Sequence, residues 1–478
     1  MKASQYNKAS TALFIAIVLG PFGLLGQQML VNPYLQPGNA PSLSKEEKVL
    51  IWQTDSVWGE YTVECTPLGE KGKTRKAKVA ADQLNLNGET TWLYRAKLTK
   101  LKFDQAYSYK VTRNGTVVAE QTFSTRTREA KTKFVVIGDC GAGTPEQGQI
   151  AKQIYSLQPQ FLLMVGDNVY DRGRAGEYRK NFFPYFNATT TSEKGAPLMS
   201  SIPFYLLLGN HDVYASDLTQ YPDGLAYFYY NDLPVNAPQP VDALEVTGKE
   251  EWVDTFKKIN KGRFPRMANY SFDVGNVHIV CLDANSYINP TDPSLMEWFI
   301  ADMQSSKADW KIVAFHQPGF NSSNAHYDYQ KMRLLSPVME RLGVDLVMSG
   351  HVHNYQRSHP LKFDPQRDES GLNYVVSPEG RVDGKFTLDD KFDGVNDTTP
   401  EGIVYIVTGA GGRALYDAQI SDNPALWKHE PDSNWVPFTL KLVSNKHSFT
   451  WVETDGRRLT LKQLDKAGAL IDQIVITK

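Results

Sequence analysis

The chain has 478 residues, which exceeds one ordinary hydrophobic core and predicts two or three domains. Hydrophobic residues make up 41% and charged residues 22%, a globular composition that excludes a mostly disordered or collagen-like chain. The formal net charge of -2 excludes a general electrostatic grip on nucleic acid, so no nucleic-acid partner is expected. Three cysteines exclude a disulfide scaffold and a cysteine zinc cluster, so any metal would need His, Asp, Asn or Tyr ligands.

Residues 1–26 are typical of an export signal peptide. Lys2 and Lys8 give a basic start, and an apolar run from 12 to 25 follows that is too short to span a bilayer comfortably. No later segment is long and apolar enough to cross a membrane, so no stable span is expected after signal cleavage. The predicted localisation is periplasmic or extracellular, and an uncleaved membrane anchor is the alternative.

Residues 27–128 read as an all-β module. Leu101 stands six residues before Tyr107, a spacing typical of the tyrosine corner of β-sandwiches, and Asn114-Gly115 indicates a hairpin. The module resembles a fibronectin type III-like domain. Its predicted strands are Val49 to Thr54, Tyr61 to Cys65, Trp92 to Leu98, Tyr107 to Thr112 and Gln121 to Thr127.

Residues 133–478 change to an alternation of short apolar runs and helix-like stretches, which predicts an α/β layered domain. Strand-like segments from 400 to 478 are expected to complete this domain. Two long connections, about 215–268 and 361–400, are expected to be loop-like. The predicted helices are Pro145 to Leu157, Ser294 to Ser305 and Tyr327 to Leu342.

Five of the apolar runs end just before a side chain that can bind a metal ion. In α/β sheets, ligands bind outside the carboxyl ends of the strands, so these side chains are expected to meet. Each motif alone is more typical of an ordinary turn, but together they could build two adjacent cation sites that share one carboxylate. In chain order they are Asp139, Asp167 with Tyr170, Asn210, His316, and His351 with His353.

These motifs resemble the calcineurin-like metallophosphoesterases, specifically the purple acid phosphatases. The resemblance covers about 133–478 and implies a sandwich of two mixed sheets flanked by helices. The N-terminal module resembles the domain that precedes the catalytic one in larger members. The matching blocks, in the family's order, are Asp-Cys-Gly at 139, Gly-Asp-Asn-Val-Tyr at 166, Gly-Asn-His-Asp at 209, Ala-Phe-His at 314 and Gly-His-Val-His at 350.

The resemblance also implies the ligands of each metal. Generic members carry a histidine ligand where this chain has Gly141, and Tyr170 is available to replace it, as in the purple enzymes. A phenolate stabilises ferric iron, so Fe(III) is expected beside a second divalent ion, Fe, Zn or Mn. The implied ligands of Fe(III) are Asp139, Asp167, Tyr170 and His353. The implied ligands of the second ion are Asn210, His316, His351 and the shared Asp167.

The function implied by the resemblance is that of a secreted acid phosphatase, a metal-dependent hydrolase of small phosphate monoesters. A metal-bound hydroxide would attack phosphorus, and an imidazolium would protonate the leaving group. His211 and His326 are the candidates for that catalytic role. One alternative is a phosphodiesterase or nucleotide pyrophosphatase with the same metal site. A more remote alternative is an exported binding protein with a dead phosphatase domain.

Overall fold

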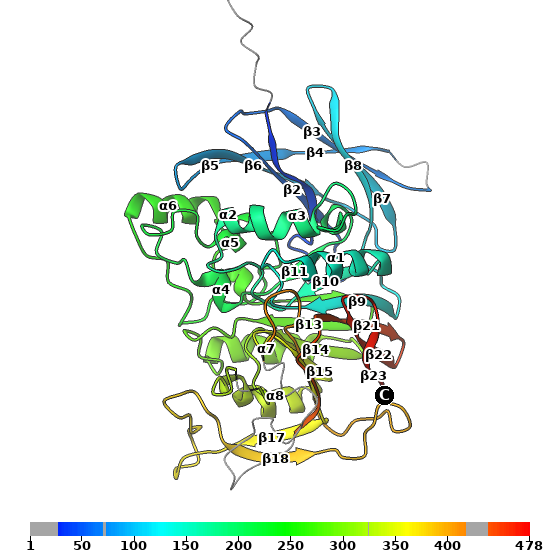
Figure 1. Cartoon of the computed structure of the whole chain (residues 1–478), viewed down its shortest axis with the longest axis vertical. Helices are drawn as coiled ribbons and strands as arrows, with labels where there is room; N and C mark the ends of the chain where they lie inside the picture. The colour runs from blue at the N-terminus through cyan, green and yellow to red at the C-terminus, as the bar shows by residue number, and fades with distance from the viewer. Residues whose placement is uncertain (1–26, 70–72, 324, 417–437) are drawn as a thin grey trace, which may run out of the picture.

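The computed structural model describes residues 27–69, 73–323, 325–416 and 438–478. The predicted signal peptide, residues 1–26, lies outside these described residues. Within the described ranges, no helix combines the length and the apolar character needed to cross a bilayer. Figure 1 shows an all-β layer at the N-terminal end of the chain, above a larger domain that alternates helices and sheets.

The N-terminal module consists of two four-stranded sheets. Trp52 and Tyr94 stack between them at a centroid distance of 5.3 Å, and Tyr107 lies in the same core. The Tyr107 hydroxyl accepts the backbone N–H of Lys102 at 2.9 Å, which is the hydrogen bond expected of a tyrosine corner. A fibronectin type III-like sandwich is consistent with this, and the domain bounds stay a prediction. The sheets are β1 (Met29–Gln36), β2 (Lys48–Thr54), β6 (Glu89–Leu98) and β5 (Val79–Leu86), and β4 (Arg75–Ala77), β3 (Tyr61–Pro67), β7 (Ala106–Arg113) and β8 (Thr116–Ser124).

The module packs directly against the larger domain. Every residue of β2 is buried, because one face of its sheet meets the module's own core and the other meets the larger domain. Tyr34 lies 5.1 Å, ring to ring, from Phe183 across this contact. Arg126 donates to the carbonyl oxygen of Asp273 at 3.0 Å. These contacts hold the module against the larger domain.

The larger domain is built on two mixed sheets that face each other. Apolar side chains from both sheets, including Val135, Leu163 and Ile312, form one buried cluster between them. In the six-stranded sheet, β9 (Lys131–Ile137), β10 (Phe161–Met164) and β11 (Phe204–Leu206) are parallel, and β21 (Ser448–Asp455), β22 (Arg458–Asp465) and β23 (Leu470–Thr477) extend it. The seven-stranded sheet has the order β12 (Tyr270–Val274), β13 (Val277–Leu282), β14 (Trp310–Phe315), β15 (Leu346–Ser349), β19 (Val404–Thr408), β16 (Tyr355–Ser358) and β20 (Thr439–Val443).

Helices cover the outer faces of both sheets (Figure 1). The helix α1 (Pro145–Leu157) begins where predicted, because the Thr144 hydroxyl accepts the N–H of Gln147 and Pro145 occupies the first turn. With α2 (Ala175–Glu177) and α3 (Phe183–Phe186) it lies between the six-stranded sheet and the N-terminal module. The opposite outer layer contains α7 (Pro293–Ser305) and α8 (Ser336–Arg341). This layered sandwich is the predicted metallophosphoesterase fold.

Three local predictions are wrong. The connection 215–268 is not purely loop-like, because it contains α5 (Ala226–Tyr230) and α6 (Glu250–Ile259). The buried ring of Phe256 in α6 packs against Phe228 in α5. The connection 361–400 contains the paired strands β17 (Leu361–Pro365) and β18 (Gly384–Leu388). The helix predicted over 327–342 begins only at 331, as a 3-10 turn before α8.

Candidate metal centre

The side chains that the sequence singles out project from loops at the carboxyl ends of the parallel strands. Asp139 follows β9, Asp167 follows β10 and His351 follows β15, and all three adopt positive φ angles of 58°, 49° and 67°. Neighbouring glycines permit these tight turns. A Cβ atom at Gly166 would lie 2.5 Å from Nδ1 of His316, and one at Gly350 would lie 2.7 Å from Oδ2 of Asp139.

One group of donor atoms gathers around Tyr170. Its hydroxyl lies 3.1 Å from Oδ1 of Asp139 and 3.2 Å from Nε2 of His353. Nδ1 of His353 lies 2.7 Å from the carbonyl oxygen of Ala414, which can only accept, so this nitrogen carries the proton. Nε2 of His353 is therefore left with a lone pair that faces the phenol and the carboxylate.

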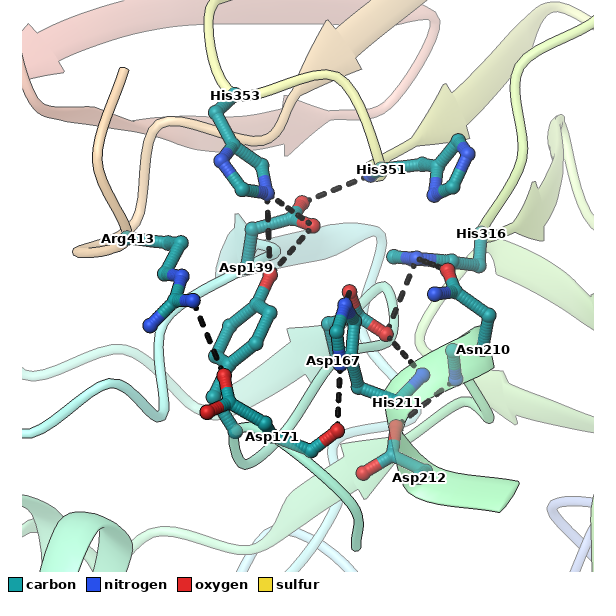
Figure 2. A network of polar contacts seen from close by, with 12 residues as sticks. Asp139, Asp167, Asp171, Asn210, His211, Asp212, His316, His351, His353 and Arg413 are labelled. Atoms are coloured by element: carbon teal, nitrogen blue, oxygen red, sulfur yellow. Dashed lines mark hydrogen bonds and ion pairs between the residues drawn. The ribbon is translucent and has the colours of Figure 1, made fainter. Parts of the chain in front are cut away.

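A second group gathers around His316. Its Nε2 lies 3.3 Å from Oδ1 of Asp167 and 3.2 Å from Oδ1 of Asn210. Its Nδ1 donates to the carbonyl oxygen of Val165 at 2.8 Å, and its ring lies 5.0 Å from that of His351. Figure 2 shows Asp139, His353, Asp167, His316 and Asn210 directed toward a common space.

Two sets of donor atoms have the compactness that a metal ion requires, and they share a residue. Ligand atoms of Asp167, His316 and His351 lie within 4.8 Å of one another, and so do those of Asp139, Asp167 and His353. All five side chains are buried. Asp167 therefore belongs to both sets, which matches a pair of cations bridged by one carboxylate.

The electrostatics of these buried groups favour a positive charge among them. Burial lowers the pKa of His316, but Asp167 outweighs burial and raises it to about 9, so in the metal-free protein a proton on this imidazole supplies that charge. Burial, together with the charge of Asp167, raises the pKa of Asp139 despite His316. Burial lowers the pKa of His353 to about 4 and that of His351 well below its usual range, so both imidazoles are neutral and can bind a metal. Within the described ranges, Nε2 of His351 has no hydrogen-bond partner although it is buried. A bound cation would satisfy this nitrogen and neutralise the carboxylates.

The two histidines predicted as catalytic also lie at this centre. His211 is partly exposed and its Nδ1 donates to the backbone oxygen of Asp171 at 2.6 Å, while its Nε2 lies 3.9 Å from Oδ2 of Asp167. The ring of His326 lies 4.0 Å from that of His351. The structure therefore brings all nine predicted site residues to one region, although their chemical roles remain a prediction.

The surroundings of Gly141 explain why this position carries no histidine ligand. A Cβ atom at this position would lie 1.8 Å from the carbonyl oxygen of Asn168, so no side chain fits. The Gly141 carbonyl instead accepts the N–H of Tyr170 at 2.9 Å, which positions the phenol.

Three further residues support the centre and were not predicted from the sequence. Asp212 accepts N–H groups of Asn168 and Gly209 and holds two ligand loops together. Tyr416 stacks on His353 at a centroid distance of 4.0 Å. Arg413 lies over the ring of Tyr170 at 4.6 Å. Its only sequence signal is its position after the glycine-rich stretch 409–412.

The comparisons with known proteins agree with this geometry. Residues 132–355 match the family described as calcineurin-like phosphoesterase. The chain is 26% identical over 388 residues to an onion (Allium cepa) protein named phosphoenolpyruvate phosphatase, covering 78% of this chain and 69% of the relative. It is 35% identical over 117 residues to purple acid phosphatase 21 of Arabidopsis thaliana, covering 23% of this chain and 26% of that one.

A solved structure shares the fold over nearly the whole chain. Purple acid phosphatase PPD1 from yellow lupin superimposes with a TM-score of 0.61 at 17% identity, covering 93% of this chain and 74% of that one. The predicted family resemblance is confirmed, and the relatives named as phosphatases are hydrolases. Residues 132–355 therefore form a calcineurin-like phosphoesterase domain, and the chain is a hydrolase that is similar to the purple acid phosphatases.

Proposed function

We propose that this protein is an exported acid phosphatase that uses two metal ions to hydrolyse small phosphate monoesters. The observation that carries the proposal is the position of Asp167, whose carboxylate belongs to both compact donor sets. Phosphatase relatives support the reaction class, and the basic and apolar N-terminal sequence supports export.

The donor chemistry supports one ferric and one divalent ion. Tyr170, with Asp139 and His353, offers an anionic oxygen-rich set that suits Fe(III). Asn210, with His316 and His351, offers a neutral set that suits Fe(II), Zn(II) or Mn(II), and Asp167 would bridge the two ions. When bound, such a pair neutralises the phosphate and lowers the pKa of water enough to supply the nucleophile.

The chain's own residues supply orientation and a proton. Nδ1 of His211 donates to the Asp171 carbonyl, which directs Nε2 toward the centre. In the imidazolium form this Nε2 can protonate the departing alkoxide. His326 lies beside His351 and can contact the ester from the other side.

Metal analysis and phosphate release on the same preparations test the proposal. The purified chain should contain two metal ions and release phosphate from monoesters below neutral pH. Asp167→Asn should lower kcat at least 1,000-fold, because it removes the shared charge that holds both ions. Asp345→Asn is the matched control, since Asp345 precedes β15 of the seven-stranded sheet, at the end of that strand away from the centre.

Two results would contradict parts of this proposal. Faster cleavage of a phosphodiester than of a phosphomonoester, measured side by side, would favour the phosphodiesterase alternative. Full activity in a preparation without metal would remove the metal mechanism altogether. Export is tested separately, by N-terminal sequencing of the protein recovered outside the cytoplasm.

A further inference from the structure

A guanidinium group lies at the rim of the candidate metal centre with no role in the chemistry proposed so far. The backbone N–H of Arg413 donates to the carbonyl oxygen of Asp139 at 3.0 Å, which fixes the root of this side chain next to a candidate ligand. Its guanidinium lies over the ring of Tyr170, with Cζ 4.6 Å from the ring centroid. Arg413 is therefore positioned from two sides.

The partner of this guanidinium is a carboxylate that is easily displaced. Nη2 of Arg413 lies 3.0 Å from Oδ1 of Asp171, as Figure 2 shows. The side chains of Arg413 and Asp171 are 40% and 63% exposed, and exposed ion pairs of this kind stabilise a fold very little. Another oxyanion could therefore replace the Asp171 carboxylate at Arg413 without unfolding anything.

Asp171 also connects Arg413 to the histidine that faces the leaving group. Its backbone oxygen accepts from Nδ1 of His211 at 2.6 Å, while its side chain contacts Arg413. A leaving group that receives a proton from His211 thus departs next to the Arg413–Asp171 pair. An oxyanion attached to that leaving group would reach the guanidinium in place of Asp171.

We propose that Arg413 is a specificity-determining residue that binds a second anionic group on the leaving group of the phosphate ester. The favoured substrates are then monoesters or anhydrides whose leaving group carries a carboxylate or a further phosphoryl group. Arginine suits both, because its planar fork can donate two parallel hydrogen bonds to either oxyanion. Asp171 occupies the fork in the absence of substrate and weakens binding by competition. This inference rests on the proposed phosphatase function.

A pair of substrates that differ only in charge tests this role. The probes are 3-carboxyphenyl phosphate and 3-carbamoylphenyl phosphate, which have nearly the same shape. Arg413→Gln should lower the ratio of their kcat/KM values about tenfold, mainly through KM for the carboxylate, because it removes a charge-assisted hydrogen bond. Asp171→Asn should raise the same ratio, because it frees the guanidinium. The ratio of kcat/KM for inorganic pyrophosphate to that for the carbamoyl ester tests whether Arg413 binds a phosphoryl group on the leaving group as well as a carboxylate.

Arg367→Gln is the matched control. Arg367 lies over the ring of Tyr374 with Cζ at 4.4 Å, so the same substitution removes the same kind of stacking outside the site, and the ratio should not change. An equal fall for both probes in Arg413→Gln would show that Arg413 only supports Tyr170, and it would overturn the proposal. So would an unchanged ratio in both Arg413→Gln and Asp171→Asn.

Binding of phosphonates, which cannot be hydrolysed, separates this inference from the proposed function. Calorimetry on the metal-loaded protein should show tighter binding of 3-phosphonopropionate than of propylphosphonate, and Arg413→Gln should remove the difference. If no ester is hydrolysed but this preference is found, the phosphatase proposal fails and Arg413 still binds the second anion. If esters are hydrolysed but the preference is absent in the unsubstituted protein, the proposal for Arg413 fails alone.

Discussion

The hydroxyl of Tyr170 lies 3.1 Å from Oδ1 of Asp139, and both groups are buried. Burial raises the pKa of Tyr170 well above its usual range, and the nearby carboxylates raise it further. A buried phenol beside a buried carboxylate is therefore neutral in the metal-free protein. Only a strongly charged cation would make the phenolate stable at this position.

We expect the iron-loaded protein to be violet, because a phenolate bound to Fe(III) has a charge-transfer band in the visible range. Tyr170→Phe should lose this band in an absorption spectrum. Tyr178→Phe is the matched control, since the buried Tyr178 hydroxyl has no hydrogen-bond partner within the described ranges and its loss should leave the colour unchanged. A colourless, iron-free preparation with full activity would refute the ferric assignment.

The leaving-group dependence of kcat should identify the proton donor. His211→Gln should lower kcat on the order of 100-fold to 10,000-fold for an alkyl phosphate, which needs protonation. The loss should be much smaller for 4-nitrophenyl phosphate, whose leaving group departs without a proton. His326→Gln is compared under the same conditions, and His359→Gln serves as the control outside the centre. If His326→Gln alone shows the strong dependence, the donor is His326 and not His211.

The sequence predicted the site better than the connections around it. A short apolar run followed by Gly-Asp, Gly-Asn-His-Asp or Gly-His-Val-His predicts a buried strand with a ligand at its carboxyl end. Because the carboxyl ends of parallel strands lie at the same edge of a sheet, this local motif is enough to predict where the ligands meet. Asp139 and His353 are 214 positions apart, yet Nε2 of His353 lies 3.5 Å from Oδ1 of Asp139. Local pattern was sufficient at these strand ends.

The unpredicted features depend on tertiary contacts. The polar segment around α6 folds as a helix because Phe256 packs against Phe228 and Phe264. The sequence near Phe256 does not predict these two contacts. His351 follows the strand β15 as expected, but the sequence does not predict the positive φ of the turn that holds it. The proposed role of Arg413 could not be predicted from the sequence for the same reason, because it depends on contacts with Tyr170 and Asp171, which are more than 200 positions away.

Gly141→Ala should disrupt the centre although no charge or ligand changes. The new methyl group would lie 1.8 Å from the carbonyl oxygen of Asn168, which forces apart the loops that carry Asp139 and Tyr170. We expect a loss of about 3 kcal/mol or more in the free energy of unfolding, together with loss of the visible band. Gly176→Ala in α2 is the control, since a Cβ atom there would meet only Oδ2 of Asp223, at an ordinary contact distance of 3.6 Å. Equal stability of both variants would contradict this close approach.

His278 should make stability depend on pH far from the metal centre. Burial alone would lower its pKa, but hydrogen bonds to Asp273 at 2.7 Å and Asp302 at 2.9 Å outweigh burial and raise the pKa to about 9. The stabilisation is fully present below the unfolded-state pKa near 6.5 and is lost as the pH rises through about 9. In urea unfolding, the advantage over His278→Gln should shrink by on the order of 3 kcal/mol between pH 6 and pH 10.

His447 provides the comparison with the opposite sign. Burial lowers its pKa, so its folded form resists protonation, and stability is lost as the pH falls below about 6.5. The stability difference between the unsubstituted protein and His447→Gln should therefore change below about pH 6.5. In the same pH range, the stability difference between the unsubstituted protein and His278→Gln should stay constant. A His278→Gln difference that stays the same from pH 6 to pH 10 would mean that the imidazolium is not held between the two carboxylates.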